Sequence, residues 1–132
     1  MDVTRNGPLA MAERRLNYLD QRQRVLAQNV ANADTPGFRP RDLQPFAQHL
    51  AQAQSAPTMV RTSAAHLAPQ GSGPGGRARA ERATVEVAPD GNAVSLDREA
   101  LRIAETDQAH AMATNLYRRW TNMYRTAIGR GQ

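Results

Sequence analysis

Apolar residues recur at helical spacing in two long stretches, one near each end of the chain. In the first stretch they step by three and four residues over about three heptads, with one polar interruption. The apolar positions are Leu9, Ala12, Leu16, Leu19, Leu26 and Val30, and Gln23 is the polar interruption. We therefore predict a helix over residues 8–33 whose seam packs against another helix. A second stripe recurs every seven residues on another face, so we expect two sets of neighbours; it consists of Met11, Tyr18 and Val25.

A proline and a glycine end this first helix. Thr35 precedes Pro36 and is pushed out of the α region by the proline ring. Pro36 followed by Gly37 suits a type II turn. Beyond the turn we predict a short helix over residues 42–53, capped by Asp42. Its apolar face consists of Leu43, Phe46 and Leu50.

The middle of the chain is rich in glycine, proline and serine. This composition is typical of a linker, which we place at residues 54–83. Residues 71–76 fit the spacing of a dinucleotide-binding glycine pattern, but no strand precedes them and no βαβ unit surrounds them. We therefore assign them no such role.

A short β-hairpin is predicted after the linker. Residues 84–87 alternate between apolar and polar as a strand does, and Asp90-Gly91 is a hairpin-type turn. We expect Val94 and Leu96 to pair back on the first strand. A two-stranded ribbon alone is marginally stable in water, so it would need support from the helices.

The second long helix is predicted over residues 97–128, with Ser95 or Asp97 as its cap. Its apolar seam steps mostly by four residues: Leu101, Ala104, Gln108, Met112, Leu116, Trp120, Met123 and Ala127. Ile103, Tyr117, Tyr124 and Ile128 add a second stripe. Toward its end the apolar face becomes too broad for one partner helix. A three-helix bundle with the short helix and lateral packing against other subunits both remain open.

These elements predict a mainly α fold. Two long terminal helices form a coiled-coil-like hairpin, a short third helix follows the first, and the middle is extended or disordered apart from a small β-hairpin. We divide the chain into an N-terminal helical segment (residues 1–53), a flexible middle segment (54–94) and a C-terminal helix (95–132). The C-terminal helix packs with the N-terminal helix as one domain.

The composition indicates that partners complete the burial of apolar surface. Of the 132 residues, 40% are hydrophobic and only 5% aromatic, so a large self-contained core is not expected. All 17 basic residues are arginine and the net charge is +5, but the arginines are interspersed with acidic residues. We interpret them as solvated surface rather than a nucleic-acid or membrane patch. With no hydrophobic signal region and no apolar run of about 18 residues, we expect no cleaved signal peptide and no membrane span.

Residues that could support catalysis or bind a cofactor are scattered. The chain has no cysteine, which excludes a disulfide or a thiolate metal site. His49, His66 and His110 have no ligand spacing, and the absence of lysine excludes a P-loop. Glu99 and Glu105 are interpreted as helix-dipole and ion-pair residues. We expect no enzyme activity, no cofactor, no metal and no small-molecule substrate.

The segment that ends the first helix resembles a known signature. Its pattern is Asn29-x-Ala31-Asn32-x-x-Thr35-Pro36-Gly37-Phe38. This is similar to the signature of the bacterial flagellar axial proteins, which are the subunits of the rod and hook. The chain is identified as a member of that family.

Three further features resemble the proximal-rod class of this family. Residues 90–99 are similar to the segment that leads into its final helix, and Arg61-Thr62 followed by His66-Leu67 is similar to its middle segment. The chain also lacks the Arg-x-Tyr-Glu-Ala-Asn tail expected of the other rod proteins and the hook protein.

The resemblance implies a structural role in motility. The chain would be a subunit of the proximal rod of the flagellar basal body, located in the periplasm and exported from the cytoplasm by the flagellar type III apparatus. Helix packing with other rod subunits and with copies of itself would transmit torque. A rod-base adaptor subunit and the export gate are the other expected partners; nucleic acid is not one.

The residues expected to make assembly contacts lie at the turn and near the end of the last helix. They are Asn29, Asn32, Thr35, Pro36, Gly37, Phe38, Leu116, Trp120, Tyr124 and Ile128. The segment from Phe46 to Leu50 also resembles the Phe-x-x-x-hydrophobic motif by which early export substrates engage the gate. The alternative is that Phe46 and Leu50 form the apolar face of a short helix.

Other functions remain open at this point. Another flagellar rod subunit would share the turn signature, and a soluble helical adaptor or export chaperone would share the amphipathic helices. A basic nucleic-acid binder would fit the charge, but the chain lacks aromatic residues interleaved with its arginines for base stacking.

Overall fold

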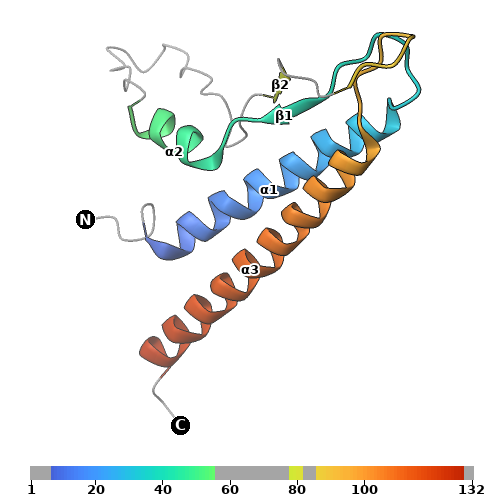
Figure 1. Cartoon of the computed structure of the whole chain (residues 1–132). Coiled ribbons are helices and arrows are strands. Elements are labelled where there is room, and N and C mark those ends of the chain that lie inside the picture. The colour runs from blue at the N-terminus through green and yellow to red at the C-terminus, as the bar shows by residue number, and fades with distance from the viewer. Residues whose placement is uncertain (1–6, 56–77, 82–85, 130–132) are drawn as a thin grey trace, which may run out of the picture.

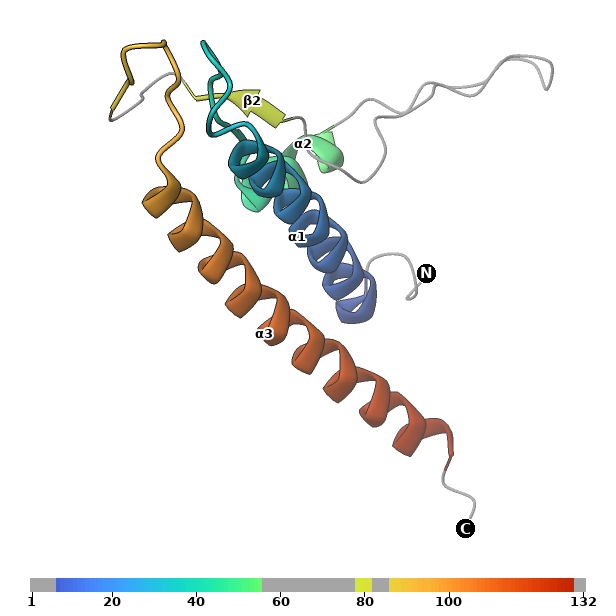
Figure 2. The same cartoon turned by 90° about the vertical axis from the view of Figure 1, so that its right-hand side faces the viewer.

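Two long helices dominate the computed structural model, which describes residues 7–55, 78–81 and 86–129. Helix α1 spans Pro8–Ala31 and helix α3 spans Leu96–Ile128. They lie side by side and run in opposite directions, and α3 extends past the first turn of α1 (Figure 1, Figure 2). The predicted mainly α fold with two long packed helices and a short third is confirmed.

Local chemistry accounts for the ends of both long helices. Pro8 occupies the start of α1, where its missing N–H has no intrahelical partner to lose. Asn32 follows the last residue of α1, and its side-chain amide donates to the Gln28 carbonyl at 2.8 Å. This bond pairs one of the carbonyl groups that a helix end leaves free. Ser95 takes the cap position of α3 without a side-chain bond, and Asp97 lies in the first turn, where the helix dipole favours a carboxylate.

The short helix begins later than predicted. Helix α2 spans Phe46–Ser55, and residues 41–43 form strand β1 (Arg41–Leu43) instead of a helical turn. Asp42 is not a cap: its carboxylate contacts the Arg22 guanidinium at 3.0 and 2.9 Å and accepts the Leu43 N–H. The hydrogen bond with Asp42 raises the pKa of Arg22 above its ordinary value. The predicted start was wrong because an ion pair with α1 holds this segment extended.

The small sheet joins two segments that the sequence analysis did not connect. Strand β1 runs antiparallel to strand β2 (Ala78–Ala80), with Arg41 opposite Ala80. The predicted linker at 54–83 therefore contains a strand, and its first residues belong to α2. Residues 56–77, which hold the glycine pattern and the Arg61 and His66 segment, lie outside the described part of the chain.

The loop before α3 contains the predicted turn but not the predicted strands. Gly91 has a left-handed φ of +82°, which glycine adopts without a steric penalty. Residues 86–95 contain no strand, and Leu96 already begins α3. The predicted return strand through Val94 and Leu96 was therefore wrong. Residues 84 and 85 of the first predicted strand lie outside the described residues.

Helix α1 lies between α3 on one side and the α2–β1 segment on the other (Figure 1). The buried cluster consists of Tyr18, Leu19, Val25, Leu43 and Ala113, with Leu16, Phe46 and Ala109 packed against it. The Tyr18 hydroxyl donates to the Gln44 carbonyl at 2.8 Å, and its ring lies 5.3 Å from the Phe46 ring. Burial raises the pKa of Tyr18 above its ordinary value. Both predicted stripes of α1 contribute to this core.

The side chains that α3 buries do not belong to its predicted seam. They are Glu99, Thr106 and Ala113. Seven large apolar residues of α3 are exposed. Four of them share one face of the helix, and we call these the outer stripe: Leu101, Met112, Leu116 and Met123. Small side chains at a contact let two helices approach closely, whereas long ones would hold them apart. The described part of the chain therefore leaves most of the predicted seam exposed, although Met112, Leu116 and Trp120 border a groove together with Met11 of α1 and Phe46 of α2.

Leu26 and Leu101 offer a matched test of where the core lies. Leu26 is 0% exposed and Leu101 is 62% exposed. Leu26→Ala should lower the free energy of unfolding by about 3 kcal/mol, because it removes buried methyl groups and leaves a cavity. Leu101→Ala should change it by less than about 0.5 kcal/mol. Urea unfolding followed by far-UV circular dichroism measures both, and equal losses would mean that the outer stripe is covered in the isolated chain.

Candidate assembly surfaces

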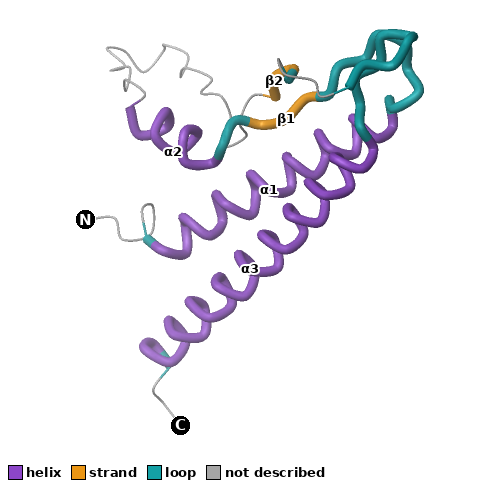
Figure 3. The backbone as a smooth tube through the Cα atoms, in the orientation of Figure 1, coloured by secondary structure: helices purple, strands orange, loops and turns teal. Residues whose placement is uncertain are grey.

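The two loops that follow α1 and precede α3 lie side by side at one end of the helical hairpin (Figure 3). We call these loops, residues 32–39 and 86–94, the tip. The Gly37 N–H donates to the Asp90 carbonyl at 3.1 Å, and the Ala93 N–H donates to the Phe38 carbonyl at 3.0 Å. Backbone hydrogen bonds therefore hold the two loops together.

The turn at the tip has the predicted geometry. The Phe38 N–H donates to the Thr35 carbonyl at 3.2 Å, and Gly37 has a φ of +71°, as a type II turn requires. A Cβ atom added to Gly91 would lie 3.4 Å from the Gly37 Cα, so the two loops meet backbone to backbone at two glycines. Pro36 and Gly37 are exposed, and Phe38 is half-buried.

Asn92 joins the two loops with its side chain. It is buried; its amide nitrogen donates to the carbonyls of Asn32 at 2.9 Å and Thr35 at 2.7 Å, and its oxygen accepts the Val94 N–H at 2.8 Å. Sequence reasoning did not select Asn92. Its position after Asp90-Gly91 was the available signal, because asparagine in a turn commonly bonds to nearby backbone.

Asn29 lies inside the molecule rather than on an assembly surface. It is 1% exposed, and its side chain pairs with both backbone groups of Arg41: Nδ2 donates to the carbonyl at 2.7 Å and Oδ1 accepts the N–H at 2.9 Å. Nδ2 also donates to Glu99 Oε2 at 2.9 Å. One amide thus connects the end of α1, strand β1 and the start of α3.

Glu99 is buried and takes part in a chain of charged groups. Its Oε1 accepts a hydrogen bond from Arg102 at 2.9 Å, and Arg102 also pairs with Glu81, which follows β2. Arg98 lies 3.5 Å from the same Glu81 carboxylate. The predicted ion-pair role of Glu99 is thus present, but its burial and its bond to Asn29 were not foreseen. A buried carboxylate needs such partners, because desolvation disfavours its charge.

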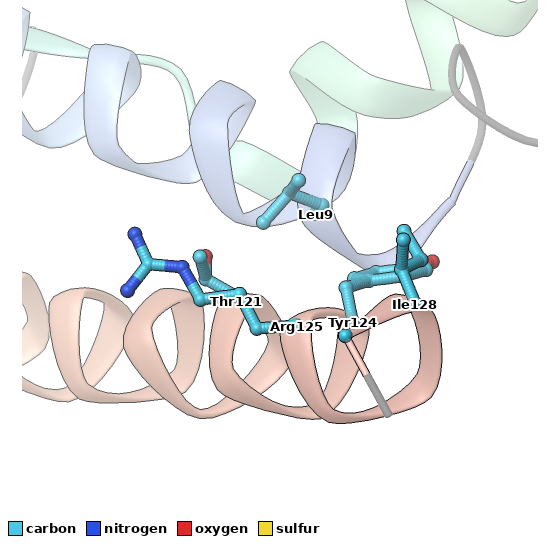
Figure 4. A pocket seen from close by; sticks show the side chains of 6 residues that line it. Leu9, Thr121, Tyr124, Arg125 and Ile128 are labelled. Atoms are coloured by element: carbon cyan, nitrogen blue, oxygen red, sulfur yellow. The ribbon is translucent and has the colours of Figure 1, made fainter. Parts of the chain in front are cut away.

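The candidate residues near the end of α3 divide between two hollows. Trp120 and Leu116 line a groove of about 410 Å³ together with Met11, Phe46 and Met112. Tyr124 and Ile128 line a hollow of about 520 Å³ whose far wall is Leu9, at the start of α1 (Figure 4). The sequence named these α3 residues without showing that the first turns of α1 complete both hollows.

The candidate gate-binding residues pack within the fold. Phe46 and Leu50 are both half-buried on α2. The Phe46 ring contacts the Tyr18 ring, and the Arg15 guanidinium lies 4.9 Å above its centre. In the folded chain Phe46 is therefore used for packing α2 against α1.

The described residues show no group of His, Asp or Glu side chains that could hold a metal ion. His110 contacts Asp20 at 3.2 Å, and the His49 ring stacks 6.4 Å from that of Tyr18. His66 lies outside the described residues. Among the helices of the described part, none is long and apolar enough to cross a membrane.

Comparison with known proteins gives consistent matches. A family model for flagella basal body rod proteins matches residues 9–39, which hold most of α1 and the first loop of the tip. The chain is 35% identical over 115 residues to the flagellar basal body rod protein FlgB of Escherichia coli K12, covering 82% of this chain and 83% of that protein. It is 36% identical over 107 residues to FlgB of Yersinia enterocolitica, covering 76% and 77%, and 34% identical over 110 residues to FlgB of Cereibacter sphaeroides, covering 83% and 84%.

The buried amide of Asn29 can be tested with a nearly isosteric change. Asn29→Asp replaces a donor by a carboxylate oxygen facing two acceptors, the Arg41 carbonyl and the Glu99 carboxylate. We expect a loss of about 3 kcal/mol in the free energy of unfolding at pH 7, because buried acceptors are left unpaired. The control Asn17→Asp makes the same change at an exposed position of α1 and should be nearly neutral.

The loss at Asn29→Asp should also depend on pH. Repulsion from Glu99 raises the pKa of the introduced carboxyl in the folded state, so the folded variant binds a proton more tightly than the unfolded one. The difference in stability from the wild type should therefore shrink as the pH falls from 7 toward 4. Urea unfolding across this range measures it, and a loss that does not change with pH would contradict the contact with Glu99.

Proposed function

This chain belongs to the family of the flagellar basal body rod protein FlgB, and we propose that it is built into the proximal part of the rod. Like the family, it is a structural subunit of the basal body rod and not an enzyme, and it assembles with other rod components. The finer proposal is that its helices pack against neighbouring subunits in the periplasm and transmit torque through those contacts.

The observation that carries this proposal is the outer stripe of α3. Met112 is 74% exposed, and the other three members are between 47% and 62% exposed. Full burial of a leucine or methionine side chain contributes about 1.5–3 kcal/mol, so a neighbour that covers the stripe would be held firmly.

The candidate assembly residues have two different roles in this proposal. Asn29, which is buried, and Asn32, which is half-buried, would position the tip, while Pro36 and Gly37 would present its surface to a neighbour. Leu116, Trp120, Tyr124 and Ile128 would make direct contacts from α3. Residues 1–53 and 95–132 act as one assembly domain, joined by the middle segment 54–94.

We also propose that the chain reaches the periplasm through the flagellar type III apparatus without a cleaved signal. Phe46 and Leu50 would engage the export gate before folding, because in the folded chain Phe46 packs against Tyr18. At the base of the rod, an adaptor subunit and further copies of this chain would be its neighbours.

The role of the outer stripe can be tested in the host. A strain lacking the gene should be non-motile and lack rods by electron microscopy of basal bodies, and wild-type protein should rescue it. Met112→Asp should fail to rescue, since a charge in a buried contact is costly. Ala111→Asp places the same carboxylate on another exposed part of α3 and should rescue. Normal flagella in the deletion strain would reject the rod assignment and favour a helical adaptor or export chaperone.

The export proposal has its own matched pair of variants. Phe46→Ala removes the gate motif and the ring contact with Tyr18, whereas Tyr18→Ala removes the same contact and keeps the motif. We expect Phe46→Ala to lower the amount of exported protein several-fold, and Tyr18→Ala to leave it unchanged, because the chain is exported unfolded. Immunoblotting of the exported fraction measures this. Equal export of both variants would show that Phe46 serves folding alone.

A further inference from the structure

The two halves of helix α3 carry different charges. Over the whole chain the arginines are interspersed with acidic residues, but along α3 they are not. The first half, residues 96–107, has four carboxylates and two arginines, whereas the second half, residues 108–128, has three arginines and no carboxylate. These three are Arg118, Arg119 and Arg125, and all are exposed. The second half therefore presents positive charge that no acidic residue of the same segment offsets.

Apolar side chains gather on one face of this basic half. Met112, Leu116 and Met123 belong to the outer stripe and are 74%, 47% and 54% exposed. Met112 and Leu116 also border the groove of about 410 Å³, together with Trp120 of α3 and Met11 of α1. We call these five residues the groove face. Its side chains are large and apolar, and most of them are open to solvent.

Two arginines flank the groove face. Arg119 follows Leu116 by three residues and precedes Met123 by four, so it lies beside them on the helix. Arg15 of α1 lines the groove, and its guanidinium lies 4.9 Å from the centre of the Phe46 ring. No carboxylate belongs to the described residues that line this groove. Because arginine can lay its stem along apolar surface and keep its charge in water, this face suits a partner that is apolar inside and negative at its surface.

We infer that the groove face binds an anionic phospholipid surface when the chain is not assembled. A helix with arginines beside an apolar face that includes tryptophan lies at the boundary between lipid headgroups and acyl chains. Tryptophan is favoured there because its ring is apolar and its N–H can bond to a polar group. Arginines close to a negative leaflet add an attraction that decays within a Debye length.

This inference goes beyond the proposed function because it concerns the free chain. In the rod, neighbouring subunits would cover the outer stripe, so its side chains would leave the lipid when the chain assembles. Leu101 distinguishes the two uses of the stripe. It is 62% exposed but lies in the acidic half of α3. Lipid binding should not need Leu101, whereas a neighbour that covers the whole stripe would contact it.

Vesicle binding by the purified full-length chain tests the inference. Trp120 is the probe, because it is the chain's single tryptophan. Vesicles made of equal parts phosphatidylglycerol and phosphatidylcholine should shift the fluorescence of Trp120 to shorter wavelength, because its ring leaves water. Vesicles of phosphatidylcholine alone should bind several-fold more weakly. Added salt should weaken binding to the anionic vesicles, because it screens the charges.

Matched variants locate the contact on the groove face. Met123→Ser and Arg119→Glu should each lower the affinity for anionic vesicles several-fold, because one removes apolar contact and the other reverses a charge. Leu101→Ser makes a comparable apolar-to-polar change in the acidic half of α3, and Arg24→Glu makes the same charge change at an exposed position of α1. Both controls should bind as the wild type does. Far-UV circular dichroism of each variant checks that it is folded.

Three results would overturn the inference. Failure to bind anionic vesicles, or equal affinity for neutral ones, would remove the proposed lipid contact. An equal shift of Trp120 fluorescence with the soluble polyanion heparin would assign the face to polyanions such as nucleic acid. Equal losses in Arg119→Glu and Arg24→Glu would place the contact elsewhere. The rescue experiment with Met112→Asp tests the rod assignment separately, so a failure of lipid binding would leave that assignment standing.

Discussion

The rest of the structure depends on one buried amide. Asn29 pairs with both backbone groups of Arg41 and with the Glu99 carboxylate, and each of these partners belongs to a different element. Without it, both backbone groups of Arg41 and one oxygen of the Glu99 carboxylate would lose their partner, and an unpaired polar group in a buried position costs more than one ordinary hydrogen bond gains. The relative placement of α1, β1 and α3 is therefore decided by polar geometry at one end of the hairpin.

In this arrangement, few apolar side chains of α3 are buried against α1. Along α3 the residues buried against α1 include Thr106 and Ala113, which are small, while the leucine and methionine side chains of the outer stripe stay exposed. In a monomer optimised for its own stability, the large apolar residues would be buried against α1 and the small ones would be exposed. A subunit of a rod has a reason to do the opposite, because apolar surface kept outward is available to its neighbours.

The two faces of α1 differ in how fully their contacts are made within the chain. Toward α2 and β1 it uses large, specific contacts: the Tyr18 and Phe46 rings, and the paired Arg22 and Asp42 side chains. These contacts form within one chain, although Phe46 also borders the groove beside α3. Toward the end of α3 the contacts are incomplete, and the hollow beside Leu9 and Ile128 stays open. At the tip, hydrogen bonds within the chain hold the two loops together, whereas apolar surface stays exposed at the opposite end of the hairpin.

The sequence by itself determined the elements whose causes are local. Apolar residues at helical spacing indicated both long helices. Thr35-Pro36-Gly37 indicated the turn, because backbone restriction acts within a few residues. It also selected Asn29 and Asn32, but not what they contact.

Only the tertiary structure decided the pairings between distant residues. Asn29 and Glu99 are 70 positions apart, and β1 pairs with a strand inside a predicted linker. Asp42 is a residue type that commonly caps helices, but its carboxylate pairs with Arg22 and the residue lies in strand β1. The sequence also did not predict which face of α3 packs against α1. An amphipathic pattern shows which residues avoid water, but not whether the same chain or a neighbour covers them.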